Sequence, residues 1–303
     1  MKIYTIIVTY NGEDLIKKCL KSLQKSTIKI DIIIVDNAST DKTTEVVKNE
    51  FPEVRLIKSK KNEGFGRANN IAMRIALDEN ADYVVILNQD TEVFSDTIEK
   101  IINISIKNPE LGIVSPLQLD ADQNITALVY HWFLKSNKSF FDDAIMGELK
   151  DFYEIDFVSA SFWLIPKKIL LKVGGFNPMF FMYGEDGEYC YRVKNKNFKI
   201  GITPQSRYIH YKINFYKKTF KMQVLEVRNY FIEHSANIKY SFTANIRSAF
   251  RYVYTEIAKF LFLFKFKIAF AYILGALLFV VNLPKVYKLR KEIIKDQATF
   301  LSS

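Results

Sequence analysis

The sequence predicts an α/β fold in which helices flank an open, mostly parallel sheet, followed by a helical C-terminal region. Strand-like and helix-like segments alternate four times in the first ninety residues, the pattern of parallel strands joined by crossover helices. Polar residues directly follow three of the apolar runs, where a purely structural sheet does not need them. The 303 residues, 49% of them hydrophobic, suffice for one substantial core and an appendage.

The order of the elements follows from hydrophobic periodicity. Residues 3–9 form an apolar run of strand length, and the apolar side chains of residues 13–25 recur on one helical face. Thr40 and Asp41 are of the types that cap helices and precede a helical pattern. The expected order is strand 3–9, helix 13–25, strand 32–35, helix 40–49, strand 54–57, helix 67–79 and strand 83–87, with helices at 167–173 and 185–192 and a strand at 199–202 further on. Residues 118–150 carry few strong patterns.

The composition indicates a cytoplasmic chain. Cys19 and Cys190 are the only cysteines, and neither has a second cysteine or a histidine at metal-site spacing. Polar residues follow Val8 at once, so the N-terminal apolar run is too short for the core of a signal peptide. We therefore expect the protein to stay in the reducing cytoplasm.

The charge is distributed unevenly. Residues 192–303 contain 21 lysines and arginines against five acids, whereas residues 1–191 contain 22 against 28. Such a basic, aromatic region suits an anionic lipid surface or nucleic acid, or is only a solvated face. We put lipid first and expect no nucleic-acid partner, because no base-reading motif accompanies the charge.

The first candidate site residues follow the first and second strands. They are Thr9, Tyr10 and Asn11 after the first, and Asp36 and Asn37 after the second. In open α/β sheets, ligands collect at the carboxyl ends of the strands. A carboxylate at Asp36 can accept the imide N–H of uracil or thymine, although Asp36 or Asn37 can equally cap a turn.

The fourth strand ends in Asn88, Gln89 and Asp90. Mg²⁺ or Mn²⁺ takes oxygen ligands, and such a cation neutralises a departing diphosphate, so Asp90 is the candidate metal-binding acid. Asn88 offers only a neutral amide oxygen. The alternative is that Asp90 begins a turn or caps a helix at Ser95.

A glycine-punctuated loop precedes the third helix. Its candidate residues are Asn62, Gly64, Arg67 and Asn69, because the exposed N–H groups of a helix N-terminus suit a phosphate. Two glycines are a weak signal. An ordinary turn into a helix would look the same.

Acidic and imidazole side chains appear later in the chain. Glu185 and Asp186 follow an aromatic segment, where a sheltered carboxylate gains the basicity of a general base, although acids in a first helical turn are also routine caps. His210 follows the last predicted strand and can reach a metal, but a lone histidine is more often structural.

Taken together, these motifs resemble the family-two inverting glycosyltransferases with a GT-A (Rossmann-like) fold, particularly the bacterial rhamnosyltransferase-like branch. The resemblance covers residues 1–212 and rests on the order of IIVTYN, IIIVDNASTD, NEGFGRANN, VVILNQD, FVSASFWLIPKKILLKVGGF, FFMYGEDGEYCYR and His210. It implies a UDP- or dTDP-sugar donor, a lipid-linked or cell-surface glycan acceptor, and Mg²⁺ or Mn²⁺.

The resemblance also assigns roles to single residues. Thr9, Asp36 and Asn37 look like base and ribose contacts. Asp90 looks like the metal-binding acid, Asp186 like the general base, and His210 like a metal or diphosphate ligand. A catalytically inactive nucleotide-sugar-binding or scaffold protein of the same fold is the alternative, although both acids are present. A nucleotidyltransferase would carry a glycine-rich, basic loop where Thr9, Tyr10 and Asn11 stand.

The sequence departs from the family pattern at four places. Asn88-Gln89-Asp90 replaces a triplet with two acids or an Asn-Pro-Asp variant. Ser159-Ala160-Ser161 lacks a frequent glycine, and Glu188 stands where aspartate is usual. The residues after His210 lack an expected glycine and serine, which makes the role of His210 the least secure.

We expect a catalytic domain at residues 1–214 and a basic, hydrophobic helical region at 215–303. Apolar residues 268–281 fall short of the ~20 that a spanning helix needs, so we expect helices lying in the interface at the inner face of the cell membrane. The alternatives are a subdomain packed on the catalytic core or in a homodimer, and a single spanning helix at 258–283. The residues expected among anionic headgroups are Lys285, Lys288, Arg290, Lys291 and Lys295.

Overall fold

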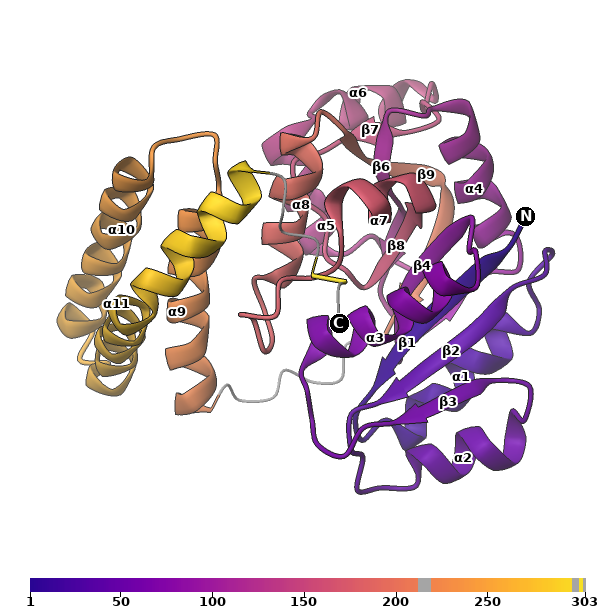
Figure 1. Ribbon diagram of the computed structural model, residues 1–303. Coiled ribbons are helices and arrows are strands. Elements are labelled where there is room, and N and C mark those ends of the chain that lie inside the picture. The colour runs from indigo at the N-terminus through magenta and orange to yellow at the C-terminus, as the bar shows by residue number, and fades with distance from the viewer. Residues whose placement is uncertain (212–218, 296–299, 302–303) are drawn as a thin grey trace.

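The computed structural model describes residues 1–211, 219–295 and 300–301 (Figure 1). A central sheet with helices on both faces forms one part, and a group of long helices lies to one side of it. The expected domain boundary between residues 214 and 215 falls outside the described residues.

The first four strands are parallel neighbours, as predicted. They are β1 (Ile3–Thr9), β2 (Asp31–Asp36), β3 (Arg55–Lys58) and β4 (Tyr83–Asn88). The full strand order is β3-β2-β1-β4-β8-β6-β9-β5, with β7 beside β9. The α/β fold is therefore confirmed, and the carboxyl ends of β1, β2 and β4 meet at one edge.

The far half of the sheet is mixed. It contains β5 (Thr91–Val93), β6 (Leu111–Leu119), β7 (Tyr153–Glu154), β8 (Phe162–Pro166) and β9 (Lys199–His210). Strand β8 runs antiparallel to β4 and β6, and β6 runs parallel to β9. Strands β5 and β7 are both antiparallel to β9. The pairing with β5 brings the end of β9 beside the end of β4.

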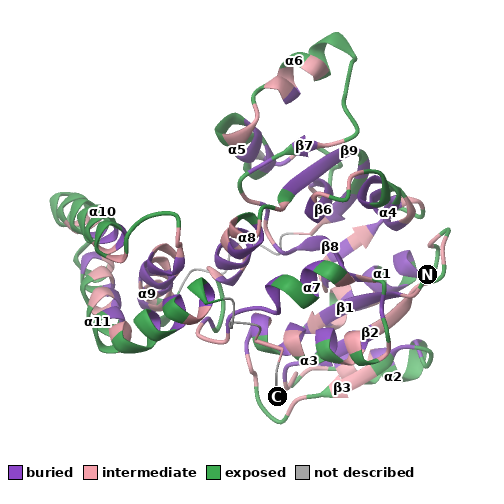
Figure 2. Ribbon diagram, turned by 45° about the horizontal axis from the view of Figure 1, so that its top comes forward, coloured by how far each residue is buried: buried purple, intermediate pink, exposed green. Residues whose placement is uncertain are grey.

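Two apolar clusters fill the faces of the sheet, because successive strand side chains point to opposite sides. Ile6 belongs to one cluster and Ile7 to the other. Figure 2 shows the strands largely buried between helices. On the Ile7 side lie α1 (Glu13–Leu23), α2 (Thr43–Glu50) and α4 (Thr97–Lys107). On the Ile6 side lie α3 (Phe65–Asp78), α5 (Ala127–Ser136), α6 (Ser139–Met146), α7 (Lys167–Val173) and α8 (Glu185–Asn195).

Three long helices form the C-terminal unit. They are α9 (Phe220–Ala236), α10 (Phe242–Phe262) and α11 (Phe266–Ile294). They pack around a third apolar cluster that includes Phe231 and Phe279, whose stacked rings have centroids 4.7 Å apart. Phe180, from the segment before α8, belongs to the same cluster. The unit is thus joined to the sheet part through that segment.

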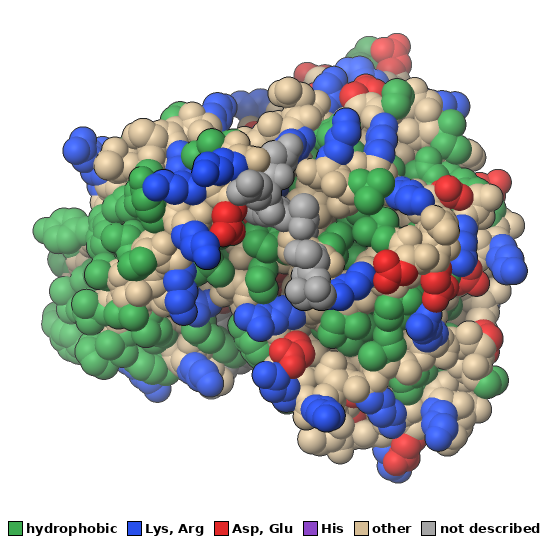
Figure 3. Space-filling model, in the orientation of Figure 1, with side chains coloured by type: hydrophobic (Ala, Val, Ile, Leu, Met, Phe, Trp, Pro, Cys, Tyr) green, Lys and Arg blue, Asp and Glu red, His purple; other side chains and the backbone are tan. Residues whose placement is uncertain are grey.

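The expectation that the apolar stretch is too short to cross a membrane is wrong. Helix α11 has 29 residues and continues through Pro284. Its most apolar window has a mean hydropathy of 2.1, and 22% of that window is buried. By length and composition alone it could span a bilayer, and Figure 3 shows hydrophobic side chains gathered over α10 and α11. A single helix at 258–283 is also wrong, because Phe264, with φ of 54°, separates α10 from α11.

Arg290 does not face outward as the sequence suggested. It is buried, and its guanidinium donates to the carbonyls of Ser235 (2.9 Å), Asn237 (2.5 Å) and Tyr240. These carbonyls lie in the last turn of α9 or directly after it, where a cation is favoured. The other four basic residues of this stretch are exposed, namely Lys285, Lys288, Lys291 and Lys295.

Candidate active site

The ends of three adjacent strands form the floor of the candidate site. Thr9 pairs in register with Asp36, and Asn88 pairs with Val8 one residue earlier on β1. The Thr9 hydroxyl donates to Asp36 Oδ1 over 2.9 Å, and the Asn37 N–H donates to the Thr9 carbonyl over 2.8 Å. The structure therefore brings these predicted residues together at one edge.

Asp36 is almost buried and holds its own turn. Its Oδ1 accepts from the hydroxyls of Thr9 and Ser39, and its Oδ2 accepts the Ser39 N–H over 3.0 Å. The turn-capping interpretation is therefore confirmed. A carboxylate oxygen has two lone pairs, so Oδ2 retains acceptor capacity for one further N–H.

The glycine loop is bonded to the end of β2 and to the segment before α8. The Asn37 side chain donates to the Gly64 carbonyl (3.1 Å) and accepts the Glu63 N–H (3.2 Å), while Asn62 accepts the Gly64 N–H (2.9 Å). Gly64 has φ of 85°, and a Cβ there would lie 2.2 Å from the Phe181 carbonyl oxygen. Only glycine fits this close approach.

The start of α3 is bonded to the segment before α8. The first N–H of the helix, on Phe65, donates to the Phe181 carbonyl (3.1 Å), and the Arg67 guanidinium donates to the Pro178 carbonyl (2.9 and 3.1 Å). Asn69 is fully buried and donates to the Phe65 carbonyl within the helix. Its burial disagrees with the expectation that Asn69 contacts a donor, and Arg67 is engaged by the same segment.

The Gln89 side-chain amide is hydrogen-bonded to the backbone of Tyr10. Its amide accepts the Tyr10 N–H and donates to the Tyr10 carbonyl, both over 3.1 Å. A Cβ on Gly12 would lie 2.2 Å from Gln89 Oε1. Asn11 accepts the Thr40 N–H over 2.8 Å. Gln89 and Asn11 thus fix the rim, while the Tyr10 ring is 47% exposed and available for stacking.

Asp90 and His210 face each other across β5 and β9. Thr91 is the register partner of His210, and His210 Nε2 lies 3.2 Å from Asp90 Oδ1. The Tyr211 N–H donates to the Asp90 carbonyl over 2.8 Å and fixes the turn. His210 Nδ1 is buried and has no hydrogen-bond partner in the described part of the chain. The structure therefore confirms that these two residues come together.

This pair fits a divalent cation that takes its other ligands from phosphate. A carboxylate and an imidazole are both metal ligands, and Nε2 and Oδ1 already converge. Within residues 1–211, 219–295 and 300–301, no group of three acidic, histidine or cysteine side chains gathers for a metal. The protein alone would thus hold the ion weakly.

Asp186 is the second residue of α8, and the helix begins directly after Gly184, which has φ of 92°. Its Oδ1 accepts the Gly187 N–H over 2.9 Å. Burial raises the pKa of Asp186, and backbone N–H donors, with that of Gly187 the largest contributor, oppose the rise. The result is a carboxylate held in place and more basic than an exposed one.

Glu185 lies beside Asp186 but is not among the residues that line the cleft next to it. It is 5% exposed, and its Oε2 has no partner among the described residues. Burial, and then the charge of Asp186, raises the pKa of Glu185 to about 8. Its predicted catalytic role therefore has less support than that of Asp186.

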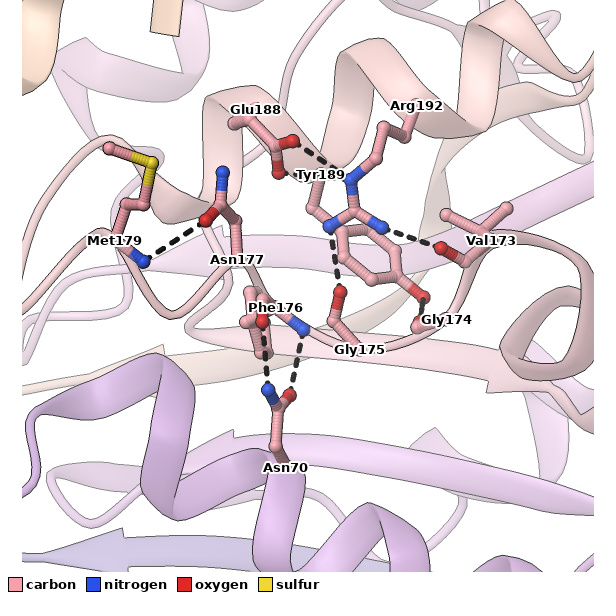
Figure 4. Close-up of polar contacts among 10 residues, drawn as sticks. All are labelled: Asn70, Val173, Gly174, Gly175, Phe176, Asn177, Met179, Glu188, Tyr189 and Arg192. Atoms are coloured by element: carbon pink, nitrogen blue, oxygen red, sulfur yellow. Dashed lines mark hydrogen bonds and ion pairs between the residues drawn. The ribbon is translucent and has the colours of Figure 1, made fainter. Parts of the chain in front are cut away.

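A buried ion pair positions the start of α8 (Figure 4). Arg192 Nε donates to both oxygens of Glu188, at 2.9 and 3.0 Å, and its other nitrogens donate to the carbonyls of Val173 (2.6 Å) and Gly175 (2.7 Å). Glu188 is thus occupied by a structural contact. The sequence signal was available, because the two residues are four apart on one helix and follow a glycine pair.

Two asparagines from other helices fix the same segment. Asn70 of α3 donates to the Phe176 carbonyl and accepts its N–H, each over 2.7 Å (Figure 4). Asn229 of α9 donates to the carbonyls of Met182 (2.9 Å) and Tyr183 (2.8 Å). The segment that presents Asp186 is therefore held from α3 on one side and from the C-terminal unit on the other.

A cleft of about 980 Å³ opens in front of Asp186, between α5, α8, α9 and α10. Its walls combine aromatic rings with basic side chains. Among the described residues, the acids that line it in addition to Asp186 are Asp156 and Glu233, the latter on α9. The aromatic residues are Trp132, Phe157, Tyr191, Tyr230, Tyr240 and Tyr252, and the basic or imidazole residues are Lys135, Lys194, Lys239, His131 and His234. Sequence reasoning missed Glu233, although it is one of only five acids after residue 191.

Known proteins are similar to this chain in sequence or in fold. The Low-salt glycan biosynthesis hexosyltransferase Agl10 of Haloferax volcanii is 27% identical over 200 residues, which are 65% of this chain and 62% of that protein. The N-acetylglucosaminyl-diphospho-decaprenol L-rhamnosyltransferase of Mycobacterium tuberculosis is 23% identical over 235 residues, covering 68% and 75%. The chain thus spans less than two thirds of the first of these relatives.

The crystal structure of S. aureus TarS 1–349 in complex with UDP-GlcNAc has the same fold. It superposes with a TM-score of 0.62 at 16% identity and covers 99% of this chain and 88% of that one. Residues 4–174, more than half of the chain, match the family model described as Glycosyl transferase family 2. The protein therefore belongs to glycosyl transferase family 2.

Proposed function

We propose that the protein is an inverting glycosyltransferase that moves a sugar, with rhamnose the first candidate, from a UDP- or dTDP-sugar to a lipid-linked or cell-surface glycan. The observation that carries the proposal is the arrangement of Asp186. This carboxylate has raised basicity and faces a wide aromatic cleft, and the strand-end residues form a separate polar floor. A base on one side and a donor floor on the other are what such a transfer needs.

The donor is assigned to the floor. Asp36 Oδ2 retains one lone pair for the imide N–H of uracil or thymine, and the exposed Tyr10 ring offers a stacking face. Thr9 and Asn37 act through Asp36 and the glycine loop, while Asn88 offers its amide at the end of β4. In support, TarS was crystallised with UDP-GlcNAc.

Asp90 and His210 would hold Mg²⁺ or Mn²⁺. Bound there, the cation supplies positive charge to the diphosphate that leaves. GalNAc-T7, whose structure superposes with a TM-score of 0.57 at 15% identity, was crystallised with UDP, GalNAc and Mn²⁺.

The reaction we infer is a single displacement. Asp186 takes the proton of the acceptor hydroxyl while the acceptor oxygen bonds to the anomeric carbon, and the bond from that carbon to the diphosphate oxygen breaks. Attack opposite the leaving group inverts the configuration. The ordered segment around Gly184 and Gly187 keeps the base in place, so that little reorganisation is needed during reaction.

The test compares Asp186→Asn with Asp142→Asn, a substitution of the same chemistry at an exposed position on α6. Transfer from dTDP-rhamnose and UDP-sugars should fall by a factor of about 10² or more in Asp186→Asn, because the general base is lost. Calorimetry should show donor binding unchanged. Transfer at near wild-type rate by this variant would contradict the proposal, and Asp142→Asn should behave as wild type.

A further inference from the structure

Glu233 is placed against the proposed catalytic base by a different part of the chain. It lies on α9, in the C-terminal unit, and lines the same cleft as Asp186. A Cβ built on Gly187, the residue after Asp186, would lie 2.1 Å from Glu233 Oε1. The carboxyl group of Glu233 therefore rests on the backbone of the turn that carries Asp186, and a side chain at position 187 would displace it.

Acidic side chains of α8 lie near Glu233, and Lys135 is the lysine whose charge opposes theirs. Burial raises the pKa of Glu233 to about 8, and the charges of Asp186, Glu188 and Glu185 add to the rise. Lys135 of α5 opposes it. The other charged or titratable groups that line this cleft are His131 of α5, Asp156, Cys190, Tyr191 and Lys194 on the α8 side, Tyr230 and His234 on α9, and Lys239, Tyr240 and Tyr252 toward α10.

At neutral pH, Glu233 is thus a neutral carboxyl group with both a donor and an acceptor oxygen. It can give and take a hydrogen bond without placing a second negative charge beside Asp186. Within the described chain it makes no hydrogen bond that would occupy it, and it borders a cleft lined by Trp132, Tyr191 and Tyr230. A sugar-binding site needs aromatic faces for the ring and polar groups that hydrogen-bond the sugar hydroxyls.

We propose that Glu233 binds the acceptor sugar beside Asp186 and thereby selects the hydroxyl group that attacks. The inference rests on the proposed transferase function and names the residue that would set acceptor specificity. Glu233 binds a hydroxyl group adjacent to the reacting one, while Asp186 receives the proton. The C-terminal unit would therefore complete the acceptor site rather than only anchor the enzyme.

The first experiment separates acceptor recognition from donor recognition. Glu233→Ala should raise KM for a dodecyl-diphospho-N-acetylglucosamine acceptor by about ten- to a hundredfold, because a polar partner of the sugar is lost. Donor binding by calorimetry should stay unchanged. Glu292→Gln, an acid on α11 outside the cleft, serves as control and should have no effect.

A second measurement asks which hydroxyl group Glu233 binds. Deoxy acceptors, each lacking one hydroxyl next to the attacking position, should be poor substrates of the wild-type enzyme. For the deoxy acceptor that lacks the hydroxyl bound by Glu233, the Glu233→Ala variant should show the same kcat/KM as for the complete acceptor. Glu233→Gln keeps the size and a donor of the side chain and should retain most activity at pH 7. The wild-type kcat/KM for the acceptor should decline above about pH 8 as Glu233 ionises, and Glu233→Gln should lose this decline.

The outcomes distinguish this inference from the proposed function. If Asp186→Asn abolishes transfer while Glu233→Ala keeps a wild-type acceptor KM, Glu233 has no acceptor role and only this inference fails. If Glu233→Ala is too unstable to assay, Glu233→Gln decides through its pH profile: an unchanged decline above pH 8 overturns the proposal. If Asp186→Asn transfers normally, the proposed function itself fails.

Discussion

At the scale of single residues, several polar side chains that the sequence offered to a ligand are bonded to the backbone instead. Gln89 and Asn69 both carry amides that the sequence assigned to the donor. In the structure Gln89 bonds the Tyr10 backbone, and Asn69 bonds its own helix. Arg290, expected among lipid headgroups, instead donates to carbonyls at the C-terminal end of α9. Sequence patterns locate polar residues but do not show whether a backbone partner takes them.

Gly64 offers a residue-scale test with an internal control. Gly64→Ala should destabilise the fold by about 1–3 kcal/mol, because its φ is 85° and the new Cβ would meet the Phe181 carbonyl at 2.2 Å. Gly147→Ala adds a Cβ at φ of 74° with nothing within 4 Å, so it should cost only about 1 kcal/mol. Urea unfolding measures both. Equal losses would show that the contact with the Phe181 carbonyl carries no weight.

At the scale of elements, the first ninety residues could be predicted because each strand there is a short apolar run and each helix has an apolar face. The predicted helix 167–173 also matches α7. Strand β6 was missed because Ser115, Pro116 and Gln118 interrupt its apolar run, although all nine of its residues are buried. The end of α11 was missed because Pro284 reads as a stop, although the helix continues through it.

The exposed apolar side of α11 gives a test at this scale. Phe270, Leu277 and Val281 are all exposed and lie at helical spacing. If this side contacts a membrane, as expected from the sequence, wild-type protein should float with phosphatidylglycerol vesicles, and the triple glutamate variant should not. Ile145→Glu on α6 serves as an exposed control.

The homodimer alternative gives a different result. Light scattering would then show a wild-type dimer that the triple variant converts to a monomer, without vesicle binding by either protein. Flotation that persists in the triple variant would contradict the membrane proposal for this face.

At the scale of the whole molecule, the sequence could place the proposed donor floor but not the proposed acceptor side. The floor comes from residues that directly follow strands, which a linear pattern reveals, and Thr9 and Asp36 are adjacent by register. The proposed acceptor cleft is assembled from α5, α8, α9 and α10. Helices α5, α8 and α9 are distant in sequence, so the meeting of Asp186 with Glu233 depends on tertiary packing.

The buried acids also make global stability depend on pH. In the unfolded chain Glu185 and Glu233 ionise near their ordinary pKa of 4.5, whereas in the folded protein their pKa values are about 8. The folded state therefore binds more protons between these values. The stability from these groups is fully present below pH 4.5 and is lost as pH rises through 8.

Urea unfolding between pH 5.5 and 8.5 checks this dependence. The free energy of unfolding should decrease as pH rises, and Glu233→Gln should show a shallower decrease because one of the two titrating groups is gone. Glu292→Gln should keep the wild-type slope. A wild-type slope in Glu233→Gln would mean that Glu233 is already ionised in the folded protein.

The bonds from Asn229 to Met182 and Tyr183, together with Phe180 in the cluster around Phe231, restrict how the protein can be recombined. The helical unit is not an interchangeable module. A chimera that joined this sheet to the C-terminal helices of a relative would keep Asp186 in its sequence and remove the supports of the segment before it. Exchange of acceptor preference between family members would therefore require the segment 179–187 and α9 to be transplanted together.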